Sequence, residues 1–407
     1  MMAPRRAARI GADPAFRTGV RTAIAGMSTA LGLIGLVWTG IAVRMARLVV
    51  TPAARRADTR ILALDTAAQT ITLSRSADTV LPGRYGLFTR GTEDYVKLGS
   101  VLAETETAVT RKLLTHIGPQ SRLAADAAFS GWYYDRPEQL HLPYSSQLIG
   151  SAVGPCPAWL FPAEHENDTW CIQVHGRGTT RAECLRAVPL LHKLGLPTLL
   201  VSYRNDGEAP RSRTGRYGLG ATEWRDIDAA IGFARRNGAA RILLMGWSMG
   251  GAISLQLALR SAHRDRLAGI ILDSPVVDWR VVLDYQARML GLPKPITSLA
   301  LQTLASNWGT AFTRTGSPIP FDDLDVVARA GELDVPVLIM HSDDDGFVPS
   351  DASHALAQAR PDLVRLEVFD TARHTKLWNY DQNRWNAAIT DWLAATGIVP
   401  ARAGSDA

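Results

Sequence analysis

The feature that most constrains this chain is the alternation of short apolar segments with longer amphipathic ones through its C-terminal two thirds. The short segments are five to seven residues long and nearly all apolar, which is typical of strands buried on both faces. Such strands, alternating with helices, form a mostly parallel sheet covered by helices on both faces. We therefore expect an α/β domain over residues 146–400. Its strands are expected at 169–174, 197–203, 241–246, 268–273, 336–340 and 364–370, and its helices from about residues 181, 223, 249, 351 and 381.

Residues 51–145 have a different pattern. Their short runs alternate apolar with polar residues, as in 70–74 and 94–102, and turn-prone stretches separate these runs. Alternation with a period of two is typical of strands that bury one face. The sequence therefore predicts a small β-rich region ahead of the α/β domain.

The N-terminal segment, residues 1–50, contains an apolar stretch at 23–43 with no charged residue over 21 positions. About 20 apolar residues are enough for a helix to cross the hydrocarbon core of a membrane. We expect a single-pass N-terminal transmembrane helix that anchors the protein in a membrane; a cleaved signal peptide and a buried helix of a soluble protein are the alternatives. Five arginines precede the stretch and five follow it by residue 60, so the side of the membrane on which the rest of the chain lies is not predicted.

Charge and cysteine content exclude several classes of function. The net charge of +5 is uneven, because residues 1–60 carry +8 and the remainder carries −3. A nucleic-acid-binding domain usually presents lysines and arginines on a folded face, so we expect no nucleic-acid partner. The three cysteines have no C-x-x-C spacing, and HExxH, GxGxxG and P-loop motifs are absent from the sequence. We therefore expect neither a metal nor a cofactor, and we leave open whether Cys156 pairs with Cys184.

A candidate nucleophile lies between a predicted strand and a predicted helix. Residues 246–250 read Gly-Trp-Ser-Met-Gly, a G-x-S-x-G pattern at the end of the strand at 241–246. Glycines on both sides of the serine let neighbouring backbones approach without a Cβ clash, and the serine is then held in a sharp turn at the N-terminal end of a helix. The pentapeptide alone is a weak signal, but this position makes Ser248 the candidate nucleophile.

A serine hydroxyl becomes a strong nucleophile when a base takes its proton and a third group orients that base. In sheets of this kind, ligands bind beyond the carboxyl ends of the strands. His374 follows the strand at 364–370 and Asp345 follows the strand at 336–340, so both are expected at the same edge as Ser248. We expect Ser248, His374 and Asp345 to be the nucleophile, the base and the orienting acid.

The order of these three residues and the motifs around them resemble the α/β-hydrolase superfamily. Residues 341–349 are similar to the family's H-G-x-x-D-x-x-V-P stretch, with serine in place of the glycine, and the match implies Asp345 as the catalytic acid. The resemblance covers roughly residues 146–397 and implies the α/β-hydrolase fold. Three other carboxylates remain alternatives for the acid, two beside Asp345 and one after an earlier strand where some members keep it: Asp343, Asp344 and Asp273.

The resemblance also implies an oxyanion hole made of two backbone amides. In the family one amide belongs to the residue after the nucleophile, here Met249. The other belongs to a loop with a His-Gly pair, here residues 175–178 (His-Gly-Arg-Gly) after the strand at 169–174, and the matching donor is Arg177. A plain glycine-rich turn is the alternative for this loop. The side chain of Arg177 is a candidate contact for an anionic group of the substrate.

An insertion rich in large apolar residues separates the fourth and fifth predicted strands. We expect it to form a helical cap over about 276–325, above Ser248, because helices at this position shape the substrate pocket in the family. Ordinary packing of amphipathic helices is the alternative. Residues 202–210 follow another strand and are either a lining of the pocket or a polar surface loop. An apolar cap and a membrane tether favour a hydrophobic or lipid-like ester as the substrate.

Within the superfamily, the chain is most similar to membrane-anchored hydrolase-domain lipases and to the catalytic domain of the prolyl oligopeptidase group. The predicted function is a membrane-anchored serine hydrolase, lipase-like or esterase-like, that cleaves a carboxylic ester through an acyl-enzyme. A serine peptidase or amidase of the prolyl oligopeptidase type is the alternative, although the β-rich region is too short for that group's propeller. A non-catalytic, membrane-tethered binding module is a further alternative, and nothing in the sequence predicts the oligomeric state.

Overall fold

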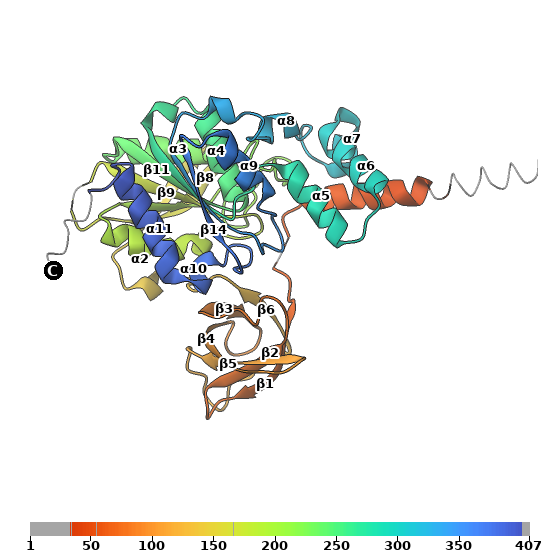
Figure 1. Ribbon diagram of the computed structural model, residues 1–407, viewed down its shortest axis with the longest axis vertical. Helices are drawn as coiled ribbons and strands as arrows, with labels where there is room; N and C mark the ends of the chain where they lie inside the picture. The colour runs from red at the N-terminus through yellow and green to blue at the C-terminus, as the bar shows by residue number, and fades with distance from the viewer. Residues whose placement is uncertain (1–32, 34, 54, 166, 401–407) are drawn as a thin grey trace, which may run out of the picture.

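The computed structural model describes residues 33, 35–53, 55–165 and 167–400. Its strands form two sheets, a closed barrel of six strands near the N-terminus and an eight-stranded sheet in the α/β domain (Figure 1). The eight strands are β7 Ser145–Ser151, β8 Gly154–Phe161, β9 Thr169–Val174, β10 Thr198–Val201, β11 Arg241–Trp247, β12 Leu267–Asp273, β13 Val337–Ser342 and β14 Val364–Phe369. They lie in the order β14-β13-β12-β11-β9-β10-β8-β7. Strands β9 to β14 run parallel, and β8 pairs antiparallel with both β10 and β7.

The predicted parallel sheet is confirmed, because its six strands correspond to β9 through β14. Strands β7 and β8 were not predicted. Strand β8 contains Pro155 and Pro157, and proline usually breaks a strand because it cannot donate a backbone hydrogen bond. Both prolines lie outside the four residues of β8 that pair with β10, so the lost donors do not interrupt that ladder.

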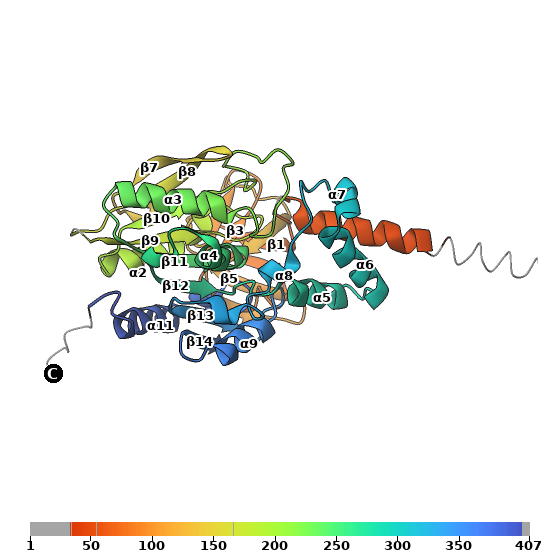
Figure 2. The same ribbon diagram turned by 90° about the horizontal axis from the view of Figure 1, so that it is seen from above.

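Helices cover both faces of this sheet (Figures 1 and 2). Neighbouring residues of one strand pack on opposite faces: Leu244 belongs to one apolar cluster, whereas Leu243 belongs to the other. The helix predicted from residue 181 begins instead as a 3-10 helix, η2, and becomes α-helical only at α2. One face carries α3 Trp224–Arg236, α4 Met249–Arg260 and α9 Asp351–Ala359, and the other carries η2 Arg181–Ala187, α2 Val188–Lys193, α10 Leu377–Tyr380 and α11 Gln382–Ala395.

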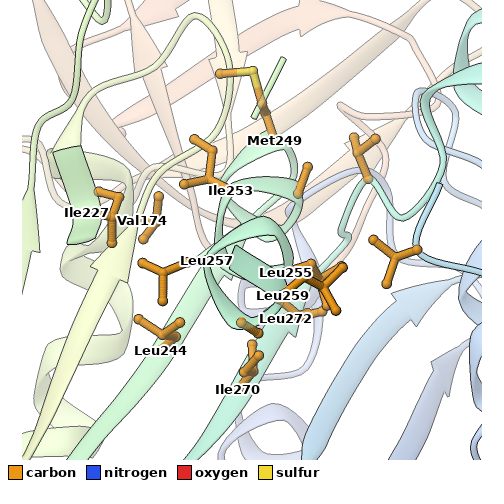
Figure 3. Close-up of a cluster of buried hydrophobic side chains, with 14 of the residues drawn as sticks. Val174, Ile227, Leu244, Met249, Ile253, Leu255, Leu257, Leu259, Ile270 and Leu272 are labelled. Carbon is orange, nitrogen blue, oxygen red and sulfur yellow. The ribbon is translucent and has the colours of Figure 1, made fainter. Parts of the chain in front are cut away.

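Helix α4 follows Ser248, and all but the last of its residues are buried. Figure 3 shows the apolar side chains that surround this helix. Leu257 of α4 and Leu244 of β11 belong to the same apolar cluster, and Leu272 of β12 lies beside the first turn of α4, where a Cβ on Gly251 would lie 3.5 Å from Leu272 Cδ2. Fully burying one such side chain contributes about 1.5–3 kcal/mol. This packing holds the N-terminal end of α4, where Met249 begins the helix, at the carboxyl edge of the sheet.

The predicted β-rich region is confirmed and closes into a small barrel, which the sequence pattern did not predict. The strand order is β1-β2-β5-β4-β3-β6. Alternate residues such as Ile71 and Leu73 point inward and form a separate apolar cluster. The strands are β1 Thr59–Asp65, β2 Thr70–Ser74, β3 Tyr85–Phe88, β4 Tyr95–Glu104, β5 Ala108–Leu113 and β6 Asp126–Ser130.

The N-terminal helix covers residue 33 and residues 35–50 of the described chain. The predicted membrane span at 23–43 lies partly outside the described residues, because 23–32 and 34 are not among them. Within the described ranges, no helix combines the length and the hydropathy needed to cross a membrane. Ala46 and Val50 join the core of the α/β domain, so the last turns of this helix pack as part of that domain.

The predicted cap region contains helices that pack along this N-terminal helix (Figure 2). Helices α5 and α6 and the N-terminal helix line an apolar cavity of only about 70 Å³. Ligand pockets usually measure about 300–1,000 Å³, so the N-terminal helix largely fills the groove between these two helices. Ordinary helix packing therefore explains much of the apolar stripe in this insertion. Its helices are α5 Trp279–Met289, α6 Lys294–Ala305, α7 Asn307–Thr313 and α8 Phe321–Leu324.

Candidate active site

The turn between β11 and α4 holds Ser248 in a strained conformation. Its backbone angles are φ 52° and ψ −116°, outside the regions that most residues with a side chain adopt. The turn needs glycine on both sides: a Cβ on Gly250 would lie 2.0 Å from the carbonyl oxygen of Val174, and one on Gly246 would lie 2.5 Å from that of Gly250. The strained turn places the serine hydroxyl at the N-terminal end of α4.

Two hydrogen bonds join the three predicted side chains. His374 Nε2 lies 2.9 Å from the Ser248 hydroxyl oxygen, and Nδ1 of the same ring lies 2.7 Å from Asp345 Oδ2. An ionised carboxylate can only accept, so Nδ1 carries the proton and Nε2 presents a lone pair to the serine hydroxyl. The Asp345 side chain has no solvent exposure and that of His374 is 18% exposed, which keeps water from competing for these bonds. The arrangement can move a proton from Ser248 to His374 Nε2.

Asp345 is held as an anion. Its second oxygen accepts the backbone amides of Phe347 at 2.8 Å and Val348 at 2.9 Å. Burial alone would raise the pKa of this carboxyl, but the rings of His374 and His341 outweigh burial and hold the pKa well below its usual range. The carboxylate therefore stays ionised and can stabilise a positive charge on the base.

His341 supports this carboxylate, a role that sequence reasoning missed. Its Nε2 lies 3.4 Å from Asp345 Oδ2 and donates to the Val348 carbonyl at 3.0 Å, and its Nδ1 accepts the Ser353 hydroxyl at 2.8 Å. The ring is almost completely buried. The sequence signal that could have identified this role is the position of His341 at the end of β13, four residues before Asp345.

The two carboxylates beside Asp345 have other partners. Asp343 accepts a hydrogen bond from His354 at 2.9 Å, and Asp344 pairs with Arg373 at 3.0 Å. Both side chains are about half exposed, at 48% and 50%. Within the described part of the chain, neither is hydrogen-bonded to His374.

Asp273 lies completely buried behind the nucleophile. Its carboxylate accepts the Trp385 indole N–H at 2.8 Å and the Ser274 hydroxyl at 3.0 Å, and its backbone carbonyl accepts the Ser248 amide at 3.0 Å. Burial raises the pKa of Asp273 to about 6, even though Arg186 opposes this shift. Asp273 thus supports the nucleophile turn from behind and, among the described residues, has no hydrogen bond to the candidate base.

The loop after β9, which carries the predicted oxyanion donor Arg177, passes beside the nucleophile. A Cβ on Gly176 would lie 3.2 Å from Ser248 Cβ, so this loop passes directly beside the serine. The Gly176 amide is already used, because it donates to Glu183 at 2.8 Å. The amides of Arg177 and Met249 donate to no other group in the described ranges. Two such free donors beside a nucleophile can bind the oxyanion of a tetrahedral intermediate.

Residues of the 202–210 segment support this loop from behind. The side chains of His175 and Asp206 lie 3.1 Å apart and have no solvent exposure. The His175 ring also stacks on Tyr203, with centroids 4.2 Å apart, and the Tyr203 hydroxyl donates to the carbonyls of His175 at 3.0 Å and Gly176 at 2.9 Å. The same segment lines part of a cavity of about 600 Å³ beside Gly178. The segment is therefore both a support for the oxyanion loop and a cavity wall.

The side chain of Arg177 points away from the site, so the expectation that it meets an anionic substrate group is wrong. Its Nε donates to the Val49 carbonyl at 2.8 Å, and its Nη2 donates to the carbonyls of Leu48 and Thr51. These carbonyls lie at the C-terminal end of the N-terminal helix, where unpaired oxygens attract cations. The guanidinium therefore ties the oxyanion loop to that helix.

The described residues offer no group of three or more His, Cys, Asp and Glu side chains placed to hold a metal ion. All three cysteines are buried free thiols, so Cys156 and Cys184 are not joined. Burial raises the pKa of Cys156 to about 11, which keeps this thiol protonated and unreactive near neutral pH.

Comparisons with known proteins agree with this fold. A model described as "Alpha/beta hydrolase family" matches residues 174–389, more than half of the chain, and a model for a domain of unknown function matches residues 60–130. A comparison with curated proteins found no match.

Similar solved structures include three esterases or lipases. An esterase from Pyrococcus furiosus is 18% identical, with 64% of this chain and 94% of that chain covered and a TM-score of 0.49. Est1E from Butyrivibrio proteoclasticus, solved with ferulic acid, is 19% identical with 62% and 99% covered and a TM-score of 0.47. A monoacylglycerol lipase from Paleococcus ferrophilus is 18% identical with 59% and 99% covered and a TM-score of 0.43. From the family match over more than half of its length, the chain belongs to the alpha/beta hydrolase family.

Proposed function

We propose that the protein is a serine hydrolase that cleaves carboxylic esters. The observation that carries this proposal is the pair of hydrogen bonds that joins Asp345, His374 and Ser248. His374 takes the proton of Ser248 as the serine oxygen attacks the ester carbonyl, and the amides of Arg177 and Met249 bind the oxyanion that forms. The proton then passes from the histidine to the leaving alcohol, and a water molecule releases the acid from the acyl-enzyme by the same route.

We further propose that the ester is hydrophobic or lipid-like. Four large apolar side chains of the cap support this assignment, because each is half exposed or more: Met289 at 65%, Leu290 at 60%, Trp308 at 50% and Phe312 at 51%. Trp308 and Phe312 also contact each other edge to face, with ring centroids 6.1 Å apart. Contiguous exposed apolar surface, such as the Trp308–Phe312 pair, is a feature of sites that bind apolar partners, and a lipid ester or the membrane that carries it is such a partner.

Ester and amide substrates with the same acyl group test the reaction. We expect the purified full chain to hydrolyse p-nitrophenyl esters at least 100-fold faster, in kcat/KM, than the matched p-nitroanilides. Among the esters, kcat/KM is expected to rise from acetate to octanoate, by up to about fourfold for each fully buried CH2. Anilide hydrolysis as fast as ester hydrolysis would replace the esterase proposal with a peptidase or amidase, and a flat chain-length series would reject the hydrophobic substrate.

We also propose that the N-terminal segment anchors the enzyme in a membrane. The uncharged stretch at 23–43 supports this, together with the exposure of its described apolar residues, such as Leu36 at 71% and Val37 at 60%. Arg44 and Arg47 follow the stretch, where cationic side chains sit at a membrane surface.

Alkaline carbonate extraction of membranes from expressing cells tests the anchor. The full chain is expected to stay with the membrane, whereas Leu36→Glu combined with Val37→Glu is expected to be released, because a charged residue near the centre of a span costs about 2.5–3.5 kcal/mol. Leu48→Glu is the matched control, because Leu48 is exposed on the same helix but lies outside the predicted span. Release of the wild-type chain by carbonate would reject the anchor.

A further inference from the structure

The barrel contacts the segment that carries His374. Figure 1 shows β3 and β6 at the end of the barrel nearest to α10, which begins three residues after His374. The contact is made by residues 78–84, which are part of the connection between β2 and β3, and by residues 373–380 of the α/β domain. The activity proposed above assigns no role to this contact or to the barrel.

Backbone and side-chain hydrogen bonds pair the two segments closely. The Asn379 side chain donates to the Arg84 carbonyl at 2.7 Å, and the Arg84 amide donates to the Asn379 carbonyl at 3.3 Å. Gly83 approaches so closely that a Cβ on it would lie 2.0 Å from the Asn379 carbonyl oxygen. The φ of Gly83 is +106°, so both the space and the backbone at this point require glycine.

Opposite charges add to this contact. Asp78 of the barrel lies 3.2 Å from Lys376 Nζ and 3.8 Å from Arg373 Nε. Lys376 and Arg373 flank His374 at distances of two residues and one residue in sequence. A carboxylate of the barrel therefore attracts the chain on both sides of the candidate base.

Residues 78–84, which make these contacts, are hydrogen-bonded to the side chain of Arg111 in the barrel interior. Arg111 is completely buried there and has no acidic partner among its hydrogen bonds in the described chain. It donates to the carbonyls of Thr79 at 2.9 Å, Leu81 at 2.8 Å and Gly83 at 2.9 Å. An arginine with its donors divided among three carbonyls of one loop sets the shape of that loop.

In the α/β domain, Arg186 links this contact to the histidine segment and to the oxyanion loop. This arginine is fully buried, and its Nη1 donates to Asn379 Oδ1 at 2.8 Å and to the Thr375 carbonyl at 2.6 Å. Its Nε donates to the backbone carbonyl of Glu183, whose carboxylate accepts the oxyanion-loop amide of Gly176. Asn379 thus joins the barrel to a buried guanidinium that contacts the residue after His374.

The residue after His374 needs this support. Thr375 has a φ of +50°, a strained conformation for a residue with a side chain, and such a conformation persists only when the surroundings hold it. Its amide donates to the Ser274 hydroxyl at 3.0 Å, and its carbonyl accepts from Arg186. Loosening either contact allows the backbone beside His374 to relax.

We propose that the barrel is a positioning module for the candidate base: by docking residues 78–84 on residues 373–380, it holds His374 Nε2 within hydrogen-bonding distance of Ser248. This inference rests on the proposed serine-hydrolase function. A base that is displaced by about 1 Å can lower the rate about 100-fold, so partial loosening of this contact should lower kcat while leaving KM nearly unchanged.

Two glycine variants of the full chain separate docking from barrel stability. Gly83→Ala introduces a clash with the α/β domain, whereas Gly91→Ala introduces an equally severe clash within the barrel, 1.8 Å from the Arg122 carbonyl oxygen. Both glycines have a positive φ, at +106° and +138°, so alanine strains the backbone in both variants. We expect Gly83→Ala to lower kcat for an ester about tenfold with KM within twofold of wild type, and Gly91→Ala to retain kcat. Equal losses of kcat in both variants, or none in Gly83→Ala, would overturn the proposal.

Exchanging the charges of Asp78 and Lys376 gives a second test, which does not require the protein to fold with either alanine clash. Asp78→Lys places a cation beside Lys376 and Arg373 and is expected to lower kcat and the rate of fluorophosphonate labelling by similar factors. Adding Lys376→Asp restores the attraction and is expected to recover at least half of both rates. If the wild type labels and Asp78→Lys labels equally fast, the barrel has no positioning role; if the wild type itself does not label, the proposed hydrolase function fails instead.

Discussion

Ser248→Ala is expected to lower kcat for ester hydrolysis by about 10⁵-fold to 10⁶-fold, the size of loss seen when a hydrolase of this kind loses its nucleophile. The hydroxyl is the only group of this side chain that can attack, and it lies 2.9 Å from His374 Nε2. The fold should be unaffected, because alanine fits wherever serine does and the strained turn depends on the glycines around it. Steady-state kinetics and the melting temperature measure the two effects separately.

Ser254→Ala provides the matched control for this variant. It makes the same serine-to-alanine change within α4, the helix that follows Ser248, and there the hydroxyl donates only to the Gly250 carbonyl at 2.8 Å in the described structure. We expect it to retain kcat within about threefold, because net loss of one such hydrogen bond costs about 1 kcal/mol of stability and no chemistry. Similar losses of kcat in both serine variants would indicate damage to α4 rather than removal of a nucleophile.

Asp345→Asn is expected to lower kcat by about 10⁴-fold with little change in KM. An asparagine amide donates to His374 Nδ1 where the carboxylate accepts from it, so the ring proton moves to Nε2 and the base can no longer accept from Ser248. The variant also removes the charge that stabilises the imidazolium during the reaction.

Asp273→Asn distinguishes the two buried carboxylates near the site. Asp273 is hydrogen-bonded to Trp385 and Ser274 in the described structure, and an asparagine oxygen can still accept either bond. We expect kcat to stay within about tenfold of wild type, with the main change in the free energy of unfolding. A loss of 10⁴-fold in Asp273→Asn together with an active Asp345→Asn would assign the acid to Asp273.

Much of the fold could be predicted because its signals are local. Strands buried on both faces are continuous apolar runs, so β9 and β13 stand out from the polar turns around them. The nucleophile turn could be predicted because close packing permits only glycine at two of its positions, and this requirement appears in the sequence. The candidate acid and base could be placed because the carboxyl ends of parallel strands meet at one edge.

The features that sequence reasoning missed depend on contacts between distant segments. The closing of the barrel requires β1 to pair with β6, more than sixty residues away, and no local pattern specifies that partner. Arg186 and Arg111 look like surface residues in sequence, yet both are completely buried among carbonyl groups. The direction of the Arg177 side chain was predicted wrongly because its partners belong to the N-terminal helix, about 130 residues earlier.

These distant contacts give the candidate site three separate supports. The N-terminal helix holds the oxyanion loop through Arg177, and the 202–210 segment holds the same loop through Tyr203 and Asp206. The barrel contacts the histidine segment through Asn379. The oxyanion loop and the histidine segment are therefore positioned by packing outside the central sheet.

The most direct test of the central claim, that the hydroxyl of Ser248 is an activated nucleophile, is to locate the adduct of a fluorophosphonate. The full wild-type chain and Ser248→Ala are treated with the probe, digested and analysed by mass spectrometry. We expect one modified residue, Ser248, in the wild type and no modification in the variant. A wild-type chain that resists the probe, an adduct on another residue, or equal labelling of Ser248→Ala would contradict the claim.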